Sequence, residues 1–252
     1  MCFAFDASPP DLPADIAPIA GGAGAELLEL ESADGTRFSA ALAESPGPRG
    51  RAVVILPDVR GLYPFYSELA ERFAAAGHHA IAIDYFGRTA GLGPRGEDFE
   101  YMPHVRQTRP ETVQEDATAA LAALRERAGA GAASTVGFCF GGTQSFLAAT
   151  NDALGLEGVV GFYGSLSPER WGENSPIHRA RDMHGPVLGL FGGADEGIPP
   201  DQVAAFDSAL AAAGVEHEIV TYPGAPHSFF DRRYEEHAEA CADAWRRMLA
   251  FL

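Results

Sequence analysis

The sequence contains no lysine, only three cysteines, and no apolar run long enough to cross a membrane. Cys2, Cys139 and Cys241 stand far apart and lack the paired spacing of a zinc or redox motif, so we expect no disulfide framework. All 18 basic residues are therefore arginine, against 35 acidic residues, and the formal net charge is −17. A chain this acidic repels phosphate backbones, which argues against nucleic acid as a partner.

The first twenty residues carry acids and prolines and lack the basic and apolar regions of a secretory signal. We therefore expect a cytoplasmic protein with no membrane partner. The 252 residues are 46% hydrophobic and 10% aromatic, which is enough apolar material for a sizeable core. We expect an N-terminal extension over residues 1–23, a single domain over residues 24–252, and a monomer or small homo-oligomer.

Short apolar or β-branched runs alternate with alanine-rich and leucine-rich stretches at helical spacing. The runs predict strands at residues 27–31, 37–42, 52–56, 80–84, 134–138, 158–162, 187–191 and 218–222. The other stretches predict helices at residues 66–76, 110–127, 141–150, 200–213 and 234–251. This alternation predicts an α/β fold with a mostly parallel central sheet of about eight strands and helices on both faces.

Two connecting segments are informative. The Asp34-Gly35 pair between the first two predicted strands indicates an antiparallel hairpin at the edge of the sheet. The irregular stretch over residues 90–107 holds Tyr101, His104 and Arg106 and follows a predicted strand. Ligands of open α/β sheets bind beyond the carboxyl ends of the strands, so this stretch is a candidate lid or binding loop.

The segment Gly137-Phe138-Cys139-Phe140-Gly141-Gly142 lies between a predicted strand and a predicted helix. It has the form of the nucleophile turn G-x-S-x-G, with cysteine in place of serine. Glycines suit this turn because the chain passes close to itself. The free N–H groups at the start of the helix favour a thiolate and can hold an oxyanion. Taken alone, the motif is also compatible with an inert cysteine in a glycine-rich bend.

Two later loops complete the order nucleophile, acid, histidine. Asp195 follows the strand predicted at residues 187–191, and His227 follows the strand predicted at residues 218–222. A lone aspartate or histidine on such a loop is usually a turn or surface residue, but the three groups in this order favour catalysis. We expect Cys139 to attack, His227 to take the thiol proton and Asp195 to orient the imidazole.

Together with Gly161-Phe162-Tyr163-Gly164, Gly192-Gly193-Ala194-Asp195 and Pro226-His227-Ser228-Phe229, this turn resembles the dienelactone hydrolase family from about residue 24 onwards. The resemblance implies an α/β-hydrolase fold and the hydrolysis of a lactone, enol ester or related carboxylic ester. It implies a small-molecule substrate, no metal or organic cofactor, and Cys139, Asp195 and His227 as the catalytic triad. Tyr163 is expected to contact the substrate.

The resemblance also implies roles for the segment Pro57-Asp58-Val59. Members of the family place a glutamate against the resting thiol, and here Asp58, one methylene shorter, stands in its place. We expect Asp58 to modulate the Cys139 thiol. We expect Val59 N–H to join Phe140 N–H in the oxyanion hole.

Family members hold a substrate carboxylate with arginines, one of them four residues after the catalytic histidine. Here that place is Asp231, followed by Arg232 and Arg233, so the substrate itself stays open. A chain of charge −17 repels anions at long range, so an anionic substrate needs arginines at the site. The candidates near the carboxyl edge of the sheet are Arg88, Arg106, Arg109 and Arg232, although structural salt bridges would explain the same residues.

Two other functions remain open: a broader carboxylesterase or thioesterase, and an α/β-hydrolase fold that serves as a small-molecule receptor without catalysis. A metal site is not expected, because the adjacent His78 and His79 would point to opposite faces of a strand and no H-E-x-x-H spacing occurs. The glycine-rich stretches match neither G-x-G-x-x-G nor a P-loop, so no nucleotide is expected.

Overall fold

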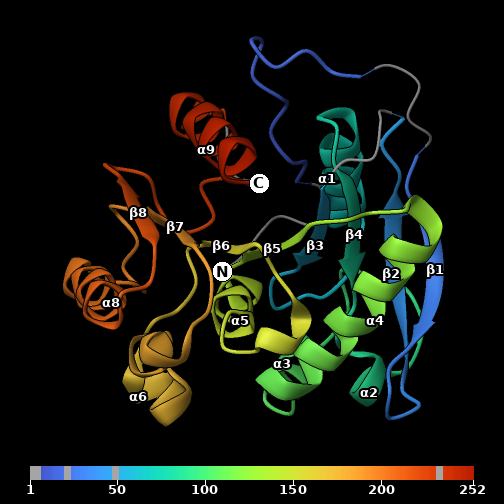
Figure 1. Cartoon of the computed structure of the whole chain (residues 1–252), viewed down its shortest axis with the longest axis horizontal. Coiled ribbons are helices and arrows are strands. Elements are labelled where there is room, and N and C mark those ends of the chain that lie inside the picture. Colours follow the sequence, from blue (N-terminus) through green and yellow to red (C-terminus); the bar gives the residue numbers. More distant parts are fainter. Residues whose placement is uncertain (1–6, 20–23, 47–50, 231–234) are drawn as a thin grey trace.

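The structure is a computed structural model that describes residues 7–19, 24–46, 51–230 and 235–252. These residues form an eight-stranded sheet with the strand order β1-β2-β4-β3-β5-β6-β7-β8 (Figure 1). The strands are β1 (Glu26–Glu31), β2 (Arg37–Ala43), β3 (Ala52–Leu56), β4 (His79–Ile83), β5 (Ala133–Phe138), β6 (Gly158–Phe162), β7 (Val187–Gly192) and β8 (His217–Tyr222).

Strand β2 pairs antiparallel with both β1 and β4, and the remaining adjacent pairs are parallel. The predicted, mostly parallel sheet is therefore confirmed, as is the hairpin at its edge. Gly35 adopts a φ of 81° in the turn of that hairpin, a conformation that glycine takes without strain.

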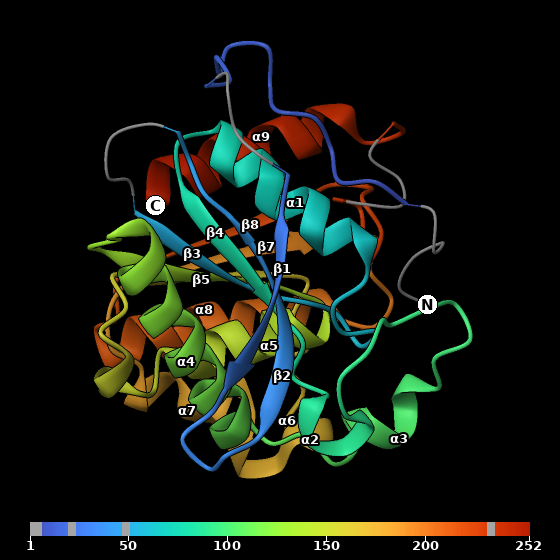
Figure 2. The same ribbon diagram turned by 90° about the vertical axis from the view of Figure 1, so that its right-hand side faces the viewer.

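Helices cover both faces of the sheet, as the alternating pattern predicts (Figure 2). Figure 2 shows α1 and α9 on one side and α4, α5 and α8 on the other. These helices are α1 (Pro64–Ala75), α4 (Pro110–Ala128), α5 (Phe140–Ala148), α8 (Pro200–Ala213) and α9 (Ala238–Phe251). Because both faces are covered, every residue of β3, β4, β5, β6 and β7 is buried. No helix among the described residues combines the length and apolar character that a membrane crossing requires.

Several short elements were not predicted from the sequence. They are α2 (Gly87–Ala90), α3 (Tyr101–Val105), α6 (Pro168–Trp171) and α7 (Pro176–Arg179), with 3₁₀ turns η1 (Asp152–Leu154), η2 (Gly172–Asn174) and η3 (Ala180–Asp182). The stretch over residues 90–107, expected to be irregular, thus contains α3. Helices of four or five residues complete too few turns to produce a detectable apolar period.

Residues 7–19, which belong to the expected extension, pack across two helices on one face of the sheet. The indole N–H of Trp245 in α9 donates to Pro10 O at 3.3 Å. Arg246, also in α9, pairs with both oxygens of Asp15 at 2.8 and 2.9 Å. Ile19 N donates to Ala75 O at the end of α1 at 2.7 Å. This segment therefore ties α1 and α9 together.

Candidate active site

Cys139 occupies a strained turn between β5 and α5. Its backbone adopts φ 54° and ψ −112°, a region that costs a non-glycine residue about 1–3 kcal/mol. The turn is held by backbone hydrogen bonds from Cys139 N to Phe162 O at 3.0 Å and from Thr143 N to Cys139 O at 3.2 Å. The thiol side chain is partly exposed and lines a pocket at the carboxyl edge of the sheet.

The glycines around Cys139 are required by close backbone approach. A Cβ atom on Gly137 would lie 2.0 Å from Gly141 O, and one on Gly141 would lie 2.0 Å from Leu56 O. Both distances are far inside van der Waals contact, so no side chain fits at either position. The same approach brings the loop that follows β3 against the start of α5.

Two backbone N–H groups beside Cys139 are available to a ligand. Val59 and Phe140 line the same pocket as Cys139. Phe140 is the first residue of α5, where an N–H group has no partner inside the helix. No described residue accepts a hydrogen bond from either N–H group. The loop that carries Val59 is fixed because Asp58 N donates to Tyr66 Oη at 2.9 Å.

Asp195 and His227 meet as the order of the loops predicts. His227 Nδ1 lies 2.6 Å from Asp195 Oδ2, and because a carboxylate only accepts, Nδ1–H donates. The second oxygen, Asp195 Oδ1, accepts Gly197 N at 2.9 Å. The Asp195 side chain is 2% exposed and that of His227 is 28% exposed, so the carboxylate is enclosed while the imidazole reaches the pocket. The Tyr163 ring lies 4.9 Å from the His227 ring.

Asp58 is fully buried in the loop after β3. Its Oδ1 accepts Arg60 N at 2.7 Å, while Oδ2 has no hydrogen-bond partner among the described residues. Burial raises the pKa of Asp58 to about 7, opposed by the Arg60 N–H and by the positive charges of Arg60 and His227. Asp58 immediately precedes Val59, which lines the same pocket as Cys139 and His227.

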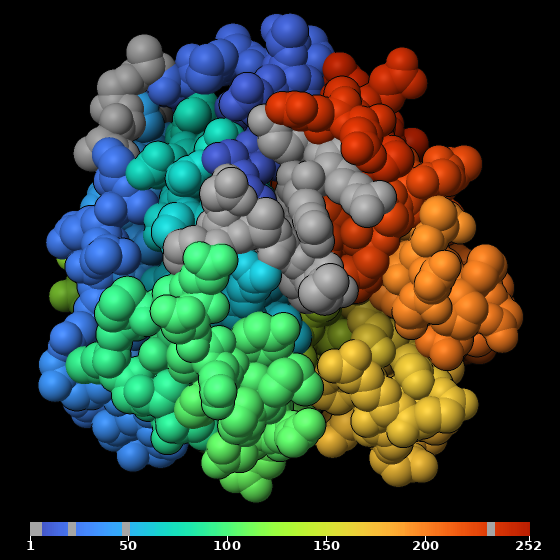
Figure 3. All heavy atoms as spheres, turned by 180° about the vertical axis from the view of Figure 1, so that it is seen from behind, coloured from blue at the N-terminus to red at the C-terminus, as the bar shows by residue number. Residues whose placement is uncertain are grey.

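The pocket that unites these groups has a volume of about 640 Å³, within the range of small-molecule sites. Figure 3 shows this face, where the segment near residue 100 (green) and the segment near residue 170 (yellow) lie on either side of a hollow. The lining residues are Val59, Tyr101, Met102, Cys139, Phe140, Thr143, Tyr163, Ser165, Arg170, Trp171, Ala194, Asp195, Glu196, Gly197, Ile198, Pro226 and His227.

The side walls of the pocket contain Tyr101, from the stretch expected to form a lid or binding loop, and three residues that the sequence did not single out, Met102, Arg170 and Trp171. Tyr101 and Met102 come from α3, and Arg170 and Trp171 come from α6. The Trp171 ring packs 5.8 Å from the Phe140 ring, and the Arg170 guanidinium lies 5.6 Å from the Trp171 ring. A local signal for α6 exists, because Ser167 caps the helix and proline takes its first position.

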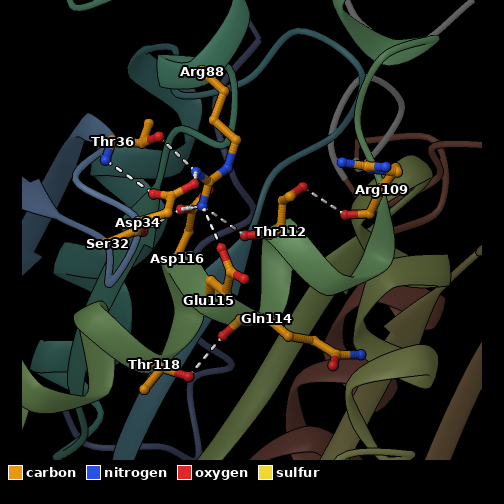
Figure 4. Close-up of polar contacts among 10 residues, drawn as sticks. All are labelled: Ser32, Asp34, Thr36, Arg88, Arg109, Thr112, Gln114, Glu115, Asp116 and Thr118. Atoms are coloured by element: carbon orange, nitrogen blue, oxygen red, sulfur yellow. Dashed lines mark hydrogen bonds and ion pairs between the residues drawn. The ribbon is translucent and has the colours of Figure 1, made fainter.

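Arg88, expected to bind substrate, does not line the pocket, and acidic side chains surround its guanidinium (Figure 4). Its guanidinium lies 2.8 Å from Asp116 and 3.1 Å from Glu115, and it also pairs with Asp34. Asp116 is 1% exposed, and this burial raises its pKa to about 6, opposed by the Ser32 hydroxyl and Arg88. Arg88 therefore joins the β1–β2 turn to α4.

The other candidate arginines are not brought to the pocket either. Arg106 follows α3 and Arg109 precedes α4, and neither lines the cavity. Arg232 lies outside the described residues. The guanidinium that does line the pocket is that of Arg170, and no carboxylate among the described residues pairs with it.

A second cavity, of about 600 Å³, lies beside the start of α9 and differs in chemistry. Its acidic lining residues are Glu235, Glu236, Glu239 and Asp243, and the lining residues that the structure describes include no cysteine or serine. Across the described residues, His, Cys, Asp and Glu side chains form no group of three or more arranged to hold a metal ion.

A sheet in which β2 runs against its neighbours, with a strained turn between β5 and α5, is that of an α/β hydrolase. Within this class the chain belongs to the dienelactone hydrolase family, whose sequence model matches residues 38–252. It is thus an enzyme of the carboxylic ester hydrolase type.

Individual relatives agree with this assignment. A Yersinia pestis protein provisionally named carboxymethylenebutenolidase is 32% identical over 203 residues, which cover 78% of this chain and 75% of the relative. A Methylorubrum extorquens protein with the same provisional name is 29% identical over 98% of this chain and 86% of its own length. A crystal structure of a protein provisionally assigned as dienelactone hydrolase, from Klebsiella pneumoniae, superimposes with a TM-score of 0.77 at 31% identity, covering 90% of this chain and 98% of that one.

Proposed function

We propose that this enzyme hydrolyses a lactone, an enol ester or a related carboxylic ester with Cys139 as the nucleophile. The observation that carries the proposal is the 2.6 Å contact between His227 Nδ1 and Asp195 Oδ2, in the same pocket as a cysteine on a strained turn. This contact fixes the proton on Nδ1, which leaves Nε2 as the base. The names of the relatives support lactones as the substrate class.

The proposed reaction has two halves. His227 Nε2 takes the Cys139 proton, and the sulfur attacks the substrate carbonyl carbon, giving a tetrahedral oxyanion that accepts hydrogen bonds from Val59 N–H and Phe140 N–H. When this intermediate collapses, the carbon–oxygen ester bond breaks and His227 returns the proton to the departing oxygen. Water, deprotonated by His227, then attacks the thioester, and the acid product and the Cys139 thiol are released.

Asp58 is proposed to modulate the thiol from inside the protein. As a carboxylate it disfavours a second negative charge on Cys139, and as a neutral acid it does not. Since burial raises its pKa to about 7, Asp58 changes charge near neutral pH. The thiol therefore meets a different local charge on either side of neutrality.

The substrate side is proposed to use Tyr163, the aromatic surface of Phe140 and Trp171, and Arg170. The rings offer a flat apolar contact beside Cys139. Arg170 supplies a positive charge that pairs with no carboxylate among the described residues, so an anionic group of the substrate can pair with it. A cytoplasmic location and action on a small molecule remain predictions from the sequence.

The test is turnover of a chromogenic ester and of an unsaturated lactone, with and without iodoacetamide. Cys139→Ala, His227→Ala and Asp195→Asn should each lower kcat by about three powers of ten, and double variants should be scarcely slower, because a triad acts as a unit. Cys2→Ser is the matched control and should retain full activity. Near-native turnover in Cys139→Ala would refute the mechanism, and tight binding without turnover in the unmodified protein would favour a receptor.

A further inference from the structure

The outer wall of the pocket, defined here as residues 95–105, has an anchor that lies outside the candidate triad. Arg95 is 5% exposed, and its Nε and Nη2 atoms lie 2.9 and 2.6 Å from Asp84 Oδ2. Arg95 Nη2 also donates to Gly91 O at 2.6 Å. Asp84 is completely buried directly after β4, so this ion pair fastens the wall to the edge of the sheet.

Stacked side chains connect Arg95 to α3. The Arg95 guanidinium lies 4.7 Å from the centre of the Phe99 ring. Phe99 stacks on His104 at 5.1 Å with an angle of 13° between the rings. Tyr101 and Met102, which lie between Phe99 and His104 in the chain, line the pocket, and Met102 is 43% exposed. Phe99 and His104 also pack on the buried Phe86 ring, at 5.8 and 6.0 Å. The position of Tyr101 and Met102 thus depends on two supports, the Phe86 ring and the Arg95 guanidinium on Phe99.

The segment that leads into the wall has little else to hold it. A Cβ atom at Gly91, Gly93 or Gly96 would meet no heavy atom of the described part of the chain within 4 Å, so these three positions are loosely packed against it. Gly91 and Gly93 adopt positive φ values, 69° and 142°, and glycine has more backbone freedom than other residues because it lacks a Cβ atom. Without the Arg95 anchor, this segment loses its ion pair to the sheet, and the nearest remaining contact of the wall is the packing of Phe99 and His104 on Phe86.

Asp84 also contacts the loop that carries the candidate oxyanion-hole donor Val59. A Cβ atom on Gly61 would lie 2.6 Å from Asp84 Oδ1, so the backbone of that loop packs directly against the carboxylate. One buried side chain therefore fixes the loop beside Cys139 on one side and the outer wall on the other.

We propose that Arg95 is a positioning residue for substrate selection: its pair with Asp84 holds the outer wall so that Tyr101 and Met102 contact a large apolar group of the substrate. This inference rests on the proposed function. It predicts that the enzyme prefers esters whose acyl part is large and apolar, such as phenylacetyl or hexanoyl, over acetyl esters of the same alcohol. The preference depends on Arg95, whereas the chemistry at Cys139 does not.

The experiment compares kcat and KM for acetyl and phenylacetyl esters of one chromogenic alcohol. In Arg95→Met we expect KM for the phenylacetyl ester to rise about tenfold, with KM for the acetyl ester and both kcat values changed less than about twofold. Arg95→Lys keeps the charge but loses the planar stack on Phe99, so its KM for the phenylacetyl ester should lie between those of the unmodified protein and Arg95→Met. Phe99→Leu should reproduce the loss with the ion pair intact.

Arg88→Met is the matched control, because Arg88, in α2 just before the segment that leads into the wall, also pairs with a buried carboxylate, that of Asp116. It should lower the melting temperature but leave the substrate preference unchanged. The double variant Asp84→Asn/Arg95→Met removes the buried unpaired charge, so it should recover stability while the preference stays lost. If the preference recovers along with stability, or if Arg88→Met loses it equally, Arg95 is only a structural residue and the inference is wrong.

Hydrogen–deuterium exchange provides a measurement that does not depend on turnover. Arg95→Met should speed exchange over residues 95–105 about tenfold and leave residues 110–128 unchanged, whereas Arg88→Met should affect residues 32–37 and the start of α4. Unchanged exchange over residues 95–105 in Arg95→Met overturns the inference. Absence of all ester turnover in the unmodified protein would instead refute the proposed function, and exchange would still test the anchor.

Discussion

Replacing Asp58 by asparagine should change how the stability of the protein depends on pH. Burial raises the pKa of Asp58 from 3.8 to about 7. The folded protein therefore binds a proton between these values that the unfolded chain has already released. This stabilising contribution is complete below about pH 4 and is lost as the pH rises through about 7.

The size of the effect follows from the shift of about three pKa units. At 1.36 kcal/mol per unit, the folded protein forfeits at most about 4 kcal/mol above pH 7 by carrying a buried charged Asp58. Between pH 5 and pH 8 the loss that belongs to Asp58 is about 2–3 kcal/mol. The asparagine side chain cannot ionise, so Asp58→Asn removes this loss.

The assay is urea unfolding of both proteins at pH 5 and pH 8. The buried amide of Asp58→Asn can cost about 1–3 kcal/mol at every pH if its N–H groups lack partners, so the informative quantity is the change between the two pH values. The free energy of unfolding should fall less in Asp58→Asn than in the unmodified protein, by about 2–3 kcal/mol. Alkylation of Cys139 in the variant should also extend to lower pH. Parallel losses of stability and identical alkylation profiles would show that Asp58 is only a loop residue.

Three further outcomes follow from the structure. Arg170→Met should raise KM about tenfold for an ester that carries a carboxylate and change KM little for a neutral ester. Arg88→Met, the control, should leave KM for both esters as in the unmodified protein. If Arg170→Met changes KM for the acidic and the neutral ester equally, the substrate has no anionic group that pairs with Arg170. Gly137→Ala should prevent or severely weaken folding, because its Cβ atom would lie 2.0 Å from a carbonyl oxygen. Gly131→Ala is the control: its Cβ atom meets no described atom within 4 Å, so this variant should unfold at nearly the same urea concentration as the unmodified protein. Arg88→Met should lower the free energy of unfolding by about 3 kcal/mol or more, since it leaves Asp116 buried without its cation, and a change below about 0.5 kcal/mol would contradict that account.

The sheet and the turn around Cys139 were predictable because their signals are local. Each buried strand is a short apolar run, and the glycines beside Cys139 mark a place where two backbones touch. Asp195 could be located because it closely follows the buried β7, and His227 because it closely follows β8, a β-branched run that is only partly buried. Their 2.6 Å contact agrees with the predicted order, while their catalytic role stays a prediction.

The walls of the pocket and the partners of the arginines were not predictable in the same way. Helices α3 and α6 are too short to show a period, although they supply Tyr101, Met102, Arg170 and Trp171. Arg88 pairs with Asp34, which lies 54 positions away in the chain. With 35 acids for 18 arginines, the sequence alone does not indicate which acid each arginine meets.

The segment formed by residues 7–19 belongs to the folded domain but lies outside the region that the family pattern matches. The family pattern begins at residue 38, yet Pro10 and Asp15 satisfy polar groups of Trp245 and Arg246 near the other end of the chain. The Trp245 ring in turn packs 5.4 Å from Phe230, three residues after His227. A version of the gene trimmed to residues 38–252 would therefore expose the indole and loosen the support of the histidine loop, even though every residue that the family pattern matches would still be encoded.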